Sequence, residues 1–103
     1  MAVVQKSIRG TWGAEDNLEL GNGRVLRIST HKVDGGLIVS TATVLNHNGH
    51  FLSHRMFTDF SQRMMTAAIR CSEKNVAAQH AECMKKLPEL KEAVAAHYAK
   101  EVA

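Results

Sequence analysis

The sequence predicts an α+β fold: a three- to four-stranded antiparallel β-meander followed by two or three C-terminal helices packed on one face of the sheet. Two observations support it. Between residues 24 and 57, β-branched and aromatic residues alternate with polar ones and Asp-Gly or Asn-Gly pairs interrupt them. After Phe57 the apolar residues recur at helical spacing. With 103 residues, of which 45% are apolar and 22% charged, the chain has the size and composition of one folded domain, 1–103.

Strands are predicted at about 24–32, 37–46 and 50–57, with a short strand at about 17–20 before them. The turn sequences "VDGG" (33–36) and "HNGH" (47–50) contain pairs that tolerate positive φ and suit two-residue hairpin turns, and "GNGR" (21–24) marks one more turn. Because neither Gly nor Pro interrupts residues 37–45, this segment is expected to be an inner strand.

Helices are predicted at about 59–71, 74–87 and 88–101. In the first of these, Asp59 and Gln62 resemble a capping box, and one stripe collects the apolar residues Phe60, Met64, Ala67, Ala68 and Cys71. Pro88 suits the first turn of a helix, so the last segment is either a third helix or a kinked continuation of the second.

Two-residue turns would divide the strand residues between two faces. The face expected beneath the helices is the one richer in large apolar side chains: Leu26, Ile28, Leu37, Val39 and Met56. The opposite face would present Val25, Arg27, Ser29 and His31, then Ile38, Ser40, Ala42 and Val44, then Phe51, Ser53, Arg55 and Phe57. A three-residue turn would exchange the two faces.

Three histidines surround the Asn-Gly pair, and their spacing argues against a metal site. In a tight hairpin His47 and His50 face each other at the tip, whereas His54 lies roughly 13 Å further along the strand. Ligands of one zinc ion lie within about 4 Å of each other, and no carboxylate or thiolate close by completes a set around His47 and His50. We therefore expect neither a metal nor another cofactor.

Catalytic motifs are also missing from the sequence. It contains no P-loop, no Rossmann glycine pattern, no nucleophile elbow and no zincin helix. Cys71 and Cys83 lie on apolar helical stripes, where a thiol is usually a core residue, although His80 lies one turn from Cys83. We expect a protein that is not an enzyme, and an unusual site built from His31, His54 and serines is the remaining alternative.

The basic charge is concentrated in the middle of the chain. Of the net +3, residues 22–72 contribute six Arg or Lys side chains against two Asp, and they hold four of the six histidines. The residues predicted to bind a partner are Arg27, His31, Phe51, Arg55 and Phe57, which share the open sheet face. The two aromatic rings could instead form a second core layer.

Open sheets with arginines and rings are typical of platforms for single-stranded nucleic acid, and protein-binding faces can resemble them. We therefore expect a small binding or regulatory protein that engages an anionic macromolecule. It could be a module that binds single-stranded DNA or RNA, or a protein-directed inhibitor or adaptor of the phage or plasmid type. The N-terminus lacks the features of a secretory signal and no apolar segment is long enough to span a membrane, so we expect a cytoplasmic protein without a membrane partner. The amphipathic C-terminal region and the partly apolar outer face of the strands also predict a homodimer.

Overall fold

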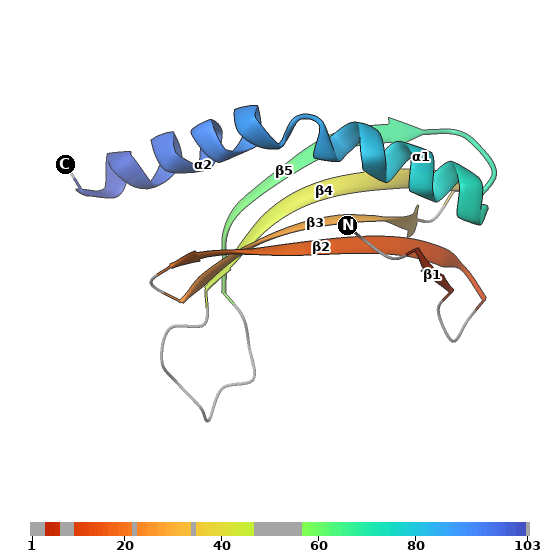
Figure 1. The fold of residues 1–103 in the computed structure, drawn as a ribbon, viewed down its shortest axis with the longest axis horizontal. Coiled ribbons are helices and arrows are strands. Elements are labelled where there is room, and N and C mark those ends of the chain that lie inside the picture. Colours follow the sequence, from red (N-terminus) through yellow and green to blue (C-terminus); the bar gives the residue numbers. More distant parts are fainter. Residues whose placement is uncertain (1–3, 7–9, 22, 34, 47–56, 103) are drawn as a thin grey trace, which may run out of the picture.

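A computed structural model describes residues 4–6, 10–21, 23–33, 35–46 and 57–102. Five strands form one antiparallel sheet in chain order, and two helices follow (Figure 1). The elements are β1 (Gln5–Lys6), β2 (Trp12–Gly21), β3 (Arg24–Val33), β4 (Leu37–Asn46), β5 (Phe57–Ala67), α1 (Glu73–Met84) and α2 (Leu87–Val102). The predicted order of an antiparallel meander followed by C-terminal helices is confirmed, with five strands instead of three or four.

The strands β3 and β4 agree with the predicted segments, but the N-terminal part of the sheet is larger than predicted. β2 begins at Trp12, whereas the sequence predicted a strand only at 17–20, and β1 was not predicted. The segment "WGAEDNLELG" is rich in acidic residues and poor in β-branched ones, so its local propensity for a strand is weak. Its pairing with β3, from Gly13 opposite His31 to Gly21 opposite Arg24, determines its conformation instead.

The prediction of a helix at 59–71 is wrong, because residues 57–67 form the strand β5. β5 pairs with β4 from Asn46 opposite Phe57 to Ile38 opposite Ala67. Two irregularities interrupt this pairing, one near Thr41 and one near Leu45. At each irregularity β5 has one extra residue, which shifts the alternation of its side chains between the two sheet faces by one position. The sequence of β5 therefore does not show a period of two.

The predicted tight turn at Asn48-Gly49 lies outside the described residues, but the pairing that it implied, Leu45 opposite Leu52, is wrong because Leu45 pairs with Thr58. Since Asn46 pairs with Phe57, the connection between β4 and β5 spans residues 47–56. Except for Phe57, the predicted strand 50–57 therefore lies outside the described residues, as do His47, His50 and His54.

One turn of unexpected length exchanges the faces of β4. Val33 pairs with Leu37, so three residues connect β3 to β4, with Gly35 and Gly36 at φ values of 89° and 76°. The face assignment of β3 was correct, with Leu26 and Ile28 fully buried beneath the helices. On β4 the residues on the helix-covered face are Ile38, Ser40, Ala42 and Val44, not the predicted Leu37 and Val39, and the predicted Met56 is not among the described residues.

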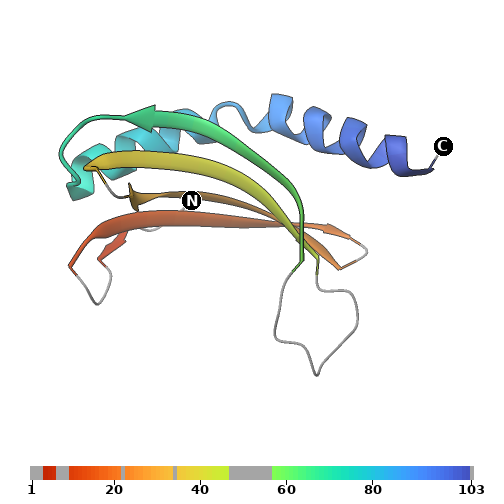
Figure 2. The same cartoon turned by 180° about the vertical axis from the view of Figure 1, so that it is seen from behind.

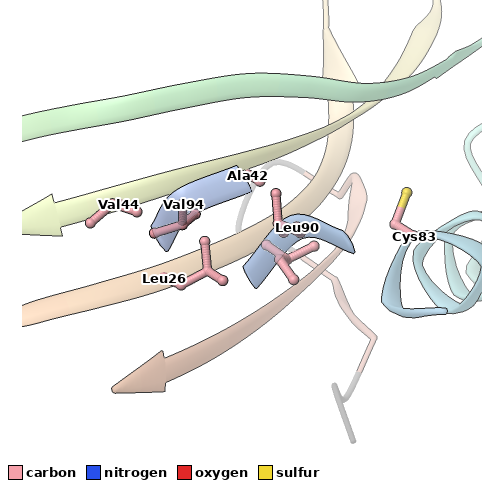
Figure 3. Close-up of a cluster of buried hydrophobic side chains, with 7 residues drawn as sticks. Leu26, Ala42, Val44, Cys83, Leu90 and Val94 are labelled. Carbon is pink, nitrogen blue, oxygen red and sulfur yellow. The ribbon is translucent and has the colours of Figure 1, made fainter. Parts of the chain in front are cut away.

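α1 and α2 are separate helices that lie on the same face of the sheet (Figure 1). Ser72 caps α1 by accepting a hydrogen bond from the backbone N–H of Asn75 at 3.2 Å, and Pro88 occupies the first turn of α2. The main core joins both helices to β3 and β4 and contains Leu26, Ile28, Ala42, Val44, Cys83, Leu90 and Val94 (Figure 3). Neither of the two described helices combines the length and apolar character that crossing a bilayer requires.

Candidate functional site

The sheet face that points away from α1 and α2 carries no helix among the described residues. Figure 2 shows the molecule from the side opposite to that of Figure 1. We call this sheet face the helix-free face. Its side chains alternate with the buried ones along each strand. They are Glu15, Asn17 and Glu19 of β2, Val25, Arg27, Ser29 and His31 of β3, Leu37, Val39, Thr41, Thr43 and Leu45 of β4, and Ser61, Arg63 and Thr66 of β5.

The accessible part of the helix-free face is polar. Of its four aliphatic side chains, Val39 and Leu45 are buried, with relative exposures of 5% and 7%, whereas Val25 and Leu37 are partly buried. His31 and Arg63 are exposed, and the side chain of Arg27 is 35% exposed. What a partner would meet is mainly hydroxyl, amide and charged groups.

Arg27 is held in a defined orientation by two residues of the neighbouring strand. Its Nε donates a hydrogen bond to Oδ1 of Asn17 at 3.0 Å and lies 3.4 Å from Oε1 of Glu15. Asn17 in turn donates from Nδ2 to Oε2 of Glu15 at 3.0 Å. Both contacts of Arg27 with the described residues use Nε, so the two terminal nitrogens of its guanidinium remain available for a bidentate contact with an anion.

A shallow hollow of about 850 Å³ lies over β1, β2 and β3 beside this arginine. Glu15, Asn17, Arg27, Ser29 and His31 are among the residues that line it. The hollow therefore contains two of the residues predicted to bind a partner, Arg27 and His31.

Arg63 provides a second cation on the far side of β4. The pairing places Arg27 beside Thr43 and Arg63 beside Thr41, so the two arginines flank the hydroxyl groups of β4. Two strand spacings separate them across the sheet, roughly 10 Å. Within the described parts of the chain, Arg63 makes no ion pair or side-chain hydrogen bond.

Sequence reasoning missed Arg63 because it placed this residue in a helix. The predicted cation at this edge was Arg55, which lies outside the described residues together with Phe51. Of Phe57 only the backbone is described, at the start of β5. The described part of the helix-free face has no aromatic side chain, so the structure brings together Arg27 and His31 of the five predicted residues.

The helix-free face also contains carboxylates, which the sequence analysis did not predict. With only three strands considered in detail, the face had no acidic residue, whereas the longer β2 adds Glu15 and Glu19. They lie at the β2 side of the sheet and Arg63 lies at the β5 side. The charge on the described part of the face is therefore polarised across the sheet and not uniformly basic.

A second group of polar residues is buried between α1 and the sheet. His80 contacts Oδ2 of Asp16 through Nε2 at 2.9 Å and the hydroxyl of Thr30 through Nδ1 at 2.8 Å. The Thr30 hydroxyl lies 2.7 Å from that of Ser40, which accepts a hydrogen bond from Nε2 of Gln79 at 3.1 Å. We refer to these five residues as the buried polar chain.

An acid, an imidazole and a hydroxyl in this order occur in hydrolytic triads, but access decides what they can do here. Thr30 and Ser40 have no exposed surface, so a substrate could not reach either hydroxyl in this conformation. Both ring nitrogens of His80 are occupied by Asp16 and Thr30, so His80 does not form a hydrogen-bonded pair with Cys83. The buried polar chain therefore joins α1 to β2, β3 and β4. The accessible candidate site is the helix-free face.

No family model, curated protein or solved structure matches this chain.

Proposed function

We propose that this protein binds single-stranded nucleic acid across its helix-free face. The observation that carries the proposal is the pair of arginines, Arg27 and Arg63, on either side of Thr41 and Thr43 on a sheet face that no described helix covers. In this arrangement Arg27 and Arg63 contact phosphates and the hydroxyl groups of β4 contact phosphate or sugar oxygens.

The exposed chemistry of the face favours a nucleic acid over a protein. Arginine, serine, threonine and asparagine make most contacts to phosphates and sugars. Centres of protein interfaces are usually apolar and aromatic, and serine is depleted there. Because Val39 and Leu45 are already buried, only Val25 and Leu37, both partly buried, remain as aliphatic side chains for such a centre on the described helix-free face.

The width of the face favours a single strand over a duplex. The major groove of B-DNA, about 12 Å wide, admits a helix or a two-stranded ribbon. The residues of the helix-free face are spread over four strands, which at about 4.8 Å per strand spacing is too wide to enter the groove. An extended single strand can instead lie across the sheet, as it does on other open sheets.

Glu15 and Glu19 balance the formal charge of Arg27 and Arg63 on this face, so binding depends on the positions of the two arginines and is sensitive to salt. The formal net charge of +3 favours approach of a polyanion. We place this activity in the cytoplasm, as a binding or regulatory function without catalysis.

The experiment compares fluorescence anisotropy of a labelled oligothymidine of about 20 nucleotides, longer than one typical site, with parent and variant proteins. The double variant Arg27→Gln, Arg63→Gln removes both cations without placing a new anion beside Glu15. We expect its affinity to fall by roughly a hundredfold or more, since charge-assisted hydrogen bonds contribute about 1.5–3 kcal/mol each and two are lost. The slope of log affinity against log salt should become shallower by about 1.4, or 0.7 for each lost phosphate contact.

The matched control is Lys74→Gln, Lys91→Gln, which removes the same charge from exposed positions on α1 and α2. Its affinity should stay within about twofold of that of the parent. Equal losses in the two double variants would show that only net charge matters. If the oligonucleotide does not bind at low salt and a nuclease-treated lysate yields an acidic protein partner, the nucleic-acid proposal is wrong.

A further inference from the structure

Among the residues that the structure describes, one edge of the sheet is unpaired along most of its length. β1 pairs with β2 only at Trp12 and Gly13, and no described strand lies beside Ala14–Gly21. The pairing of this segment with β3 is regular from Ala14 to Glu19. Its outer backbone N–H and C=O groups therefore form a template to which another extended segment can add.

Two grooves border this edge on its helix-covered side. The first, of about 630 Å³, is lined by Val4, Asp16, Ala77, His80, Ala81, Met84 and Lys85, and we call it the α1 groove. The second, of about 430 Å³, is lined by Leu18, Glu19, Leu20, Gly21, Arg24, Lys91, Val94, Ala95 and Tyr98, and we call it the α2 groove. Both have mainly apolar walls, and Leu20 in the second is partly exposed.

The positions of the grooves match the repeat of an extended peptide. Asp16 borders the α1 groove, and Leu18 and Leu20 border the α2 groove. Asp16 and Leu18 are two positions apart, or roughly 7 Å along a strand, and Leu20 lies at the irregularity between Glu19 and Gly21. Side chains at alternate positions of an added strand would point toward the two grooves in succession.

The charge of the edge distinguishes between possible occupants. Glu15, Asp16 and Glu19 are its charged residues from Ala14 to Gly21, and all are acidic. Pairing of this edge with the same edge of a second copy would bring these carboxylates together, which is unfavourable. The other edge strand, β5, has two irregularities in its pairing that disfavour a long regular ladder.

We propose that the β2 edge binds an extended peptide segment of a partner protein, in which apolar residues alternate with lysine or arginine. The apolar side chains fill the α1 and α2 grooves, and the basic ones, on the other side of the added strand, meet Glu15 and Glu19. Oδ1 of Asp16 makes no contact with the described residues and can accept a hydrogen bond from this segment. This site borders the helix-free face, to which Glu15 and Glu19 belong, and does not depend on the function proposed for that face.

The probe is a capped peptide of about eight residues that alternates lysine with valine or leucine, which is long enough to pair with Ala14–Gly21. Its affinity is measured by isothermal titration calorimetry, and its position by ¹H–¹⁵N chemical shifts and amide exchange. We expect slower exchange of the outward-facing amides of β2. A version with proline at its centre should bind at least tenfold more weakly because it lacks an N–H for the ladder, and a glutamate version should not bind.

The protein variant Ala81→Lys places a long cationic side chain in the α1 groove from an exposed helical position. Its matched control, Ala78→Lys, makes the same change at an exposed position of α1 outside both grooves. Peptide affinity should fall about tenfold or more in the first and stay within about twofold in the second. Thermal melting confirms that both variants are folded.

Three results would overturn the proposal. They are absence of binding by the lysine peptide, equal affinity of its proline version, and shifts located away from β2 and the grooves. Equal affinity of the proline version would mean that the acidic edge attracts cations without forming a strand pair.

Discussion

The side chains of Thr30 on β3 and His80 on α1 are in hydrogen-bond contact, with 2.8 Å between the Thr30 hydroxyl and Nδ1 of His80. The ends of the buried polar chain set the direction of this bond. The Gln79 amide nitrogen can only donate, and it donates to Ser40 and to the backbone carbonyl of Ile38. At the other end the ionised carboxylate of Asp16 can only accept. When the His80 ring is neutral, its Nε2 therefore donates to Asp16, Thr30 donates to Nδ1 of His80, and Ser40 donates to Thr30.

Removing one hydroxyl from this chain should destabilise the fold. Thr30→Val keeps the shape of the side chain but leaves Nδ1 of His80 and the Ser40 hydroxyl without their partner in a fully buried position. We expect a loss of about 1–3 kcal/mol in the free energy of unfolding, measured with urea. Thr41→Val, on the helix-free face, is the control and should change it by no more than about 0.5 kcal/mol. Equal stability of the two variants would contradict a structural role for the chain.

The direction of the chain also predicts the tautomer of His80. In the neutral ring, the proton should lie on Nε2, where Asp16 accepts it, and Nδ1 should be unprotonated, where Thr30 donates. Long-range ¹H–¹⁵N correlation spectra distinguish the two nitrogens by their ¹⁵N shifts. A proton on Nδ1 of the neutral ring would show that the hydrogen bonds of the buried polar chain are donated in the opposite direction.

The strand β5 shows where sequence reasoning fails on this fold. Phe60, Met64 and Ala67 follow helical spacing, and Met and Ala favour helices when considered alone. In the folded chain, pairing with β4 provides the context that overrides this preference. Segments with regular periodicity and clear boundaries were predicted well, since β3, β4, α1 and α2 all formed close to the predicted positions.

The candidate site was predictable only in part, for the same reason. Arg27 is on the predicted face because the alternation of β3 was read correctly. Arg63 could be recognised only after β5 was known to be a strand, and Glu15 and Glu19 only after the full length of β2 was known. The three-residue turn after Val33 determines which residues of β4 lie on the helix-free face. The sequence did not predict its length, because glycines at 35 and 36 permit more than one turn length.

Relieving the negative charge beside Arg27 should strengthen nucleic-acid binding. In Glu15→Gln an amide oxygen can still accept the hydrogen bond from Asn17, so Arg27 keeps its support while the anion 3.4 Å away disappears. We expect affinity for oligothymidine to rise about fivefold, since such a pair is worth about 1 kcal/mol in a water-like environment. Glu92→Gln, at an exposed position on α2, should give a smaller gain at the same net charge. Equal gains would indicate that proximity to Arg27 is unimportant.

Glu82 should titrate below the usual range of a glutamate. A hydrogen bond from Nζ of Lys85 at 2.9 Å, followed by the charge of that lysine, lowers the pKa of the Glu82 carboxyl, with a lesser contribution from Lys86, and partial desolvation opposes them. Because the pKa is lower in the folded state, the pair contributes to stability above the unfolded pKa. This contribution disappears as pH falls through the folded pKa. Carboxyl ¹³C titration should show the pKa rise in Lys85→Met and stay unchanged in Lys74→Met.

Chemical-shift mapping with oligothymidine at low salt tests the central claim most directly. On titration into ¹⁵N-labelled protein, the account predicts progressive shifts of the backbone amides of Arg27, Ser29, Thr41, Thr43 and Arg63, together with the side-chain Nε signals of both arginines. Amides of α1 and α2, on the opposite side of the sheet, should remain in place. Shifts confined to the helices, or no shifts at an oligonucleotide concentration that saturates typical single-strand binders, would contradict the assignment of the helix-free face as a nucleic-acid surface.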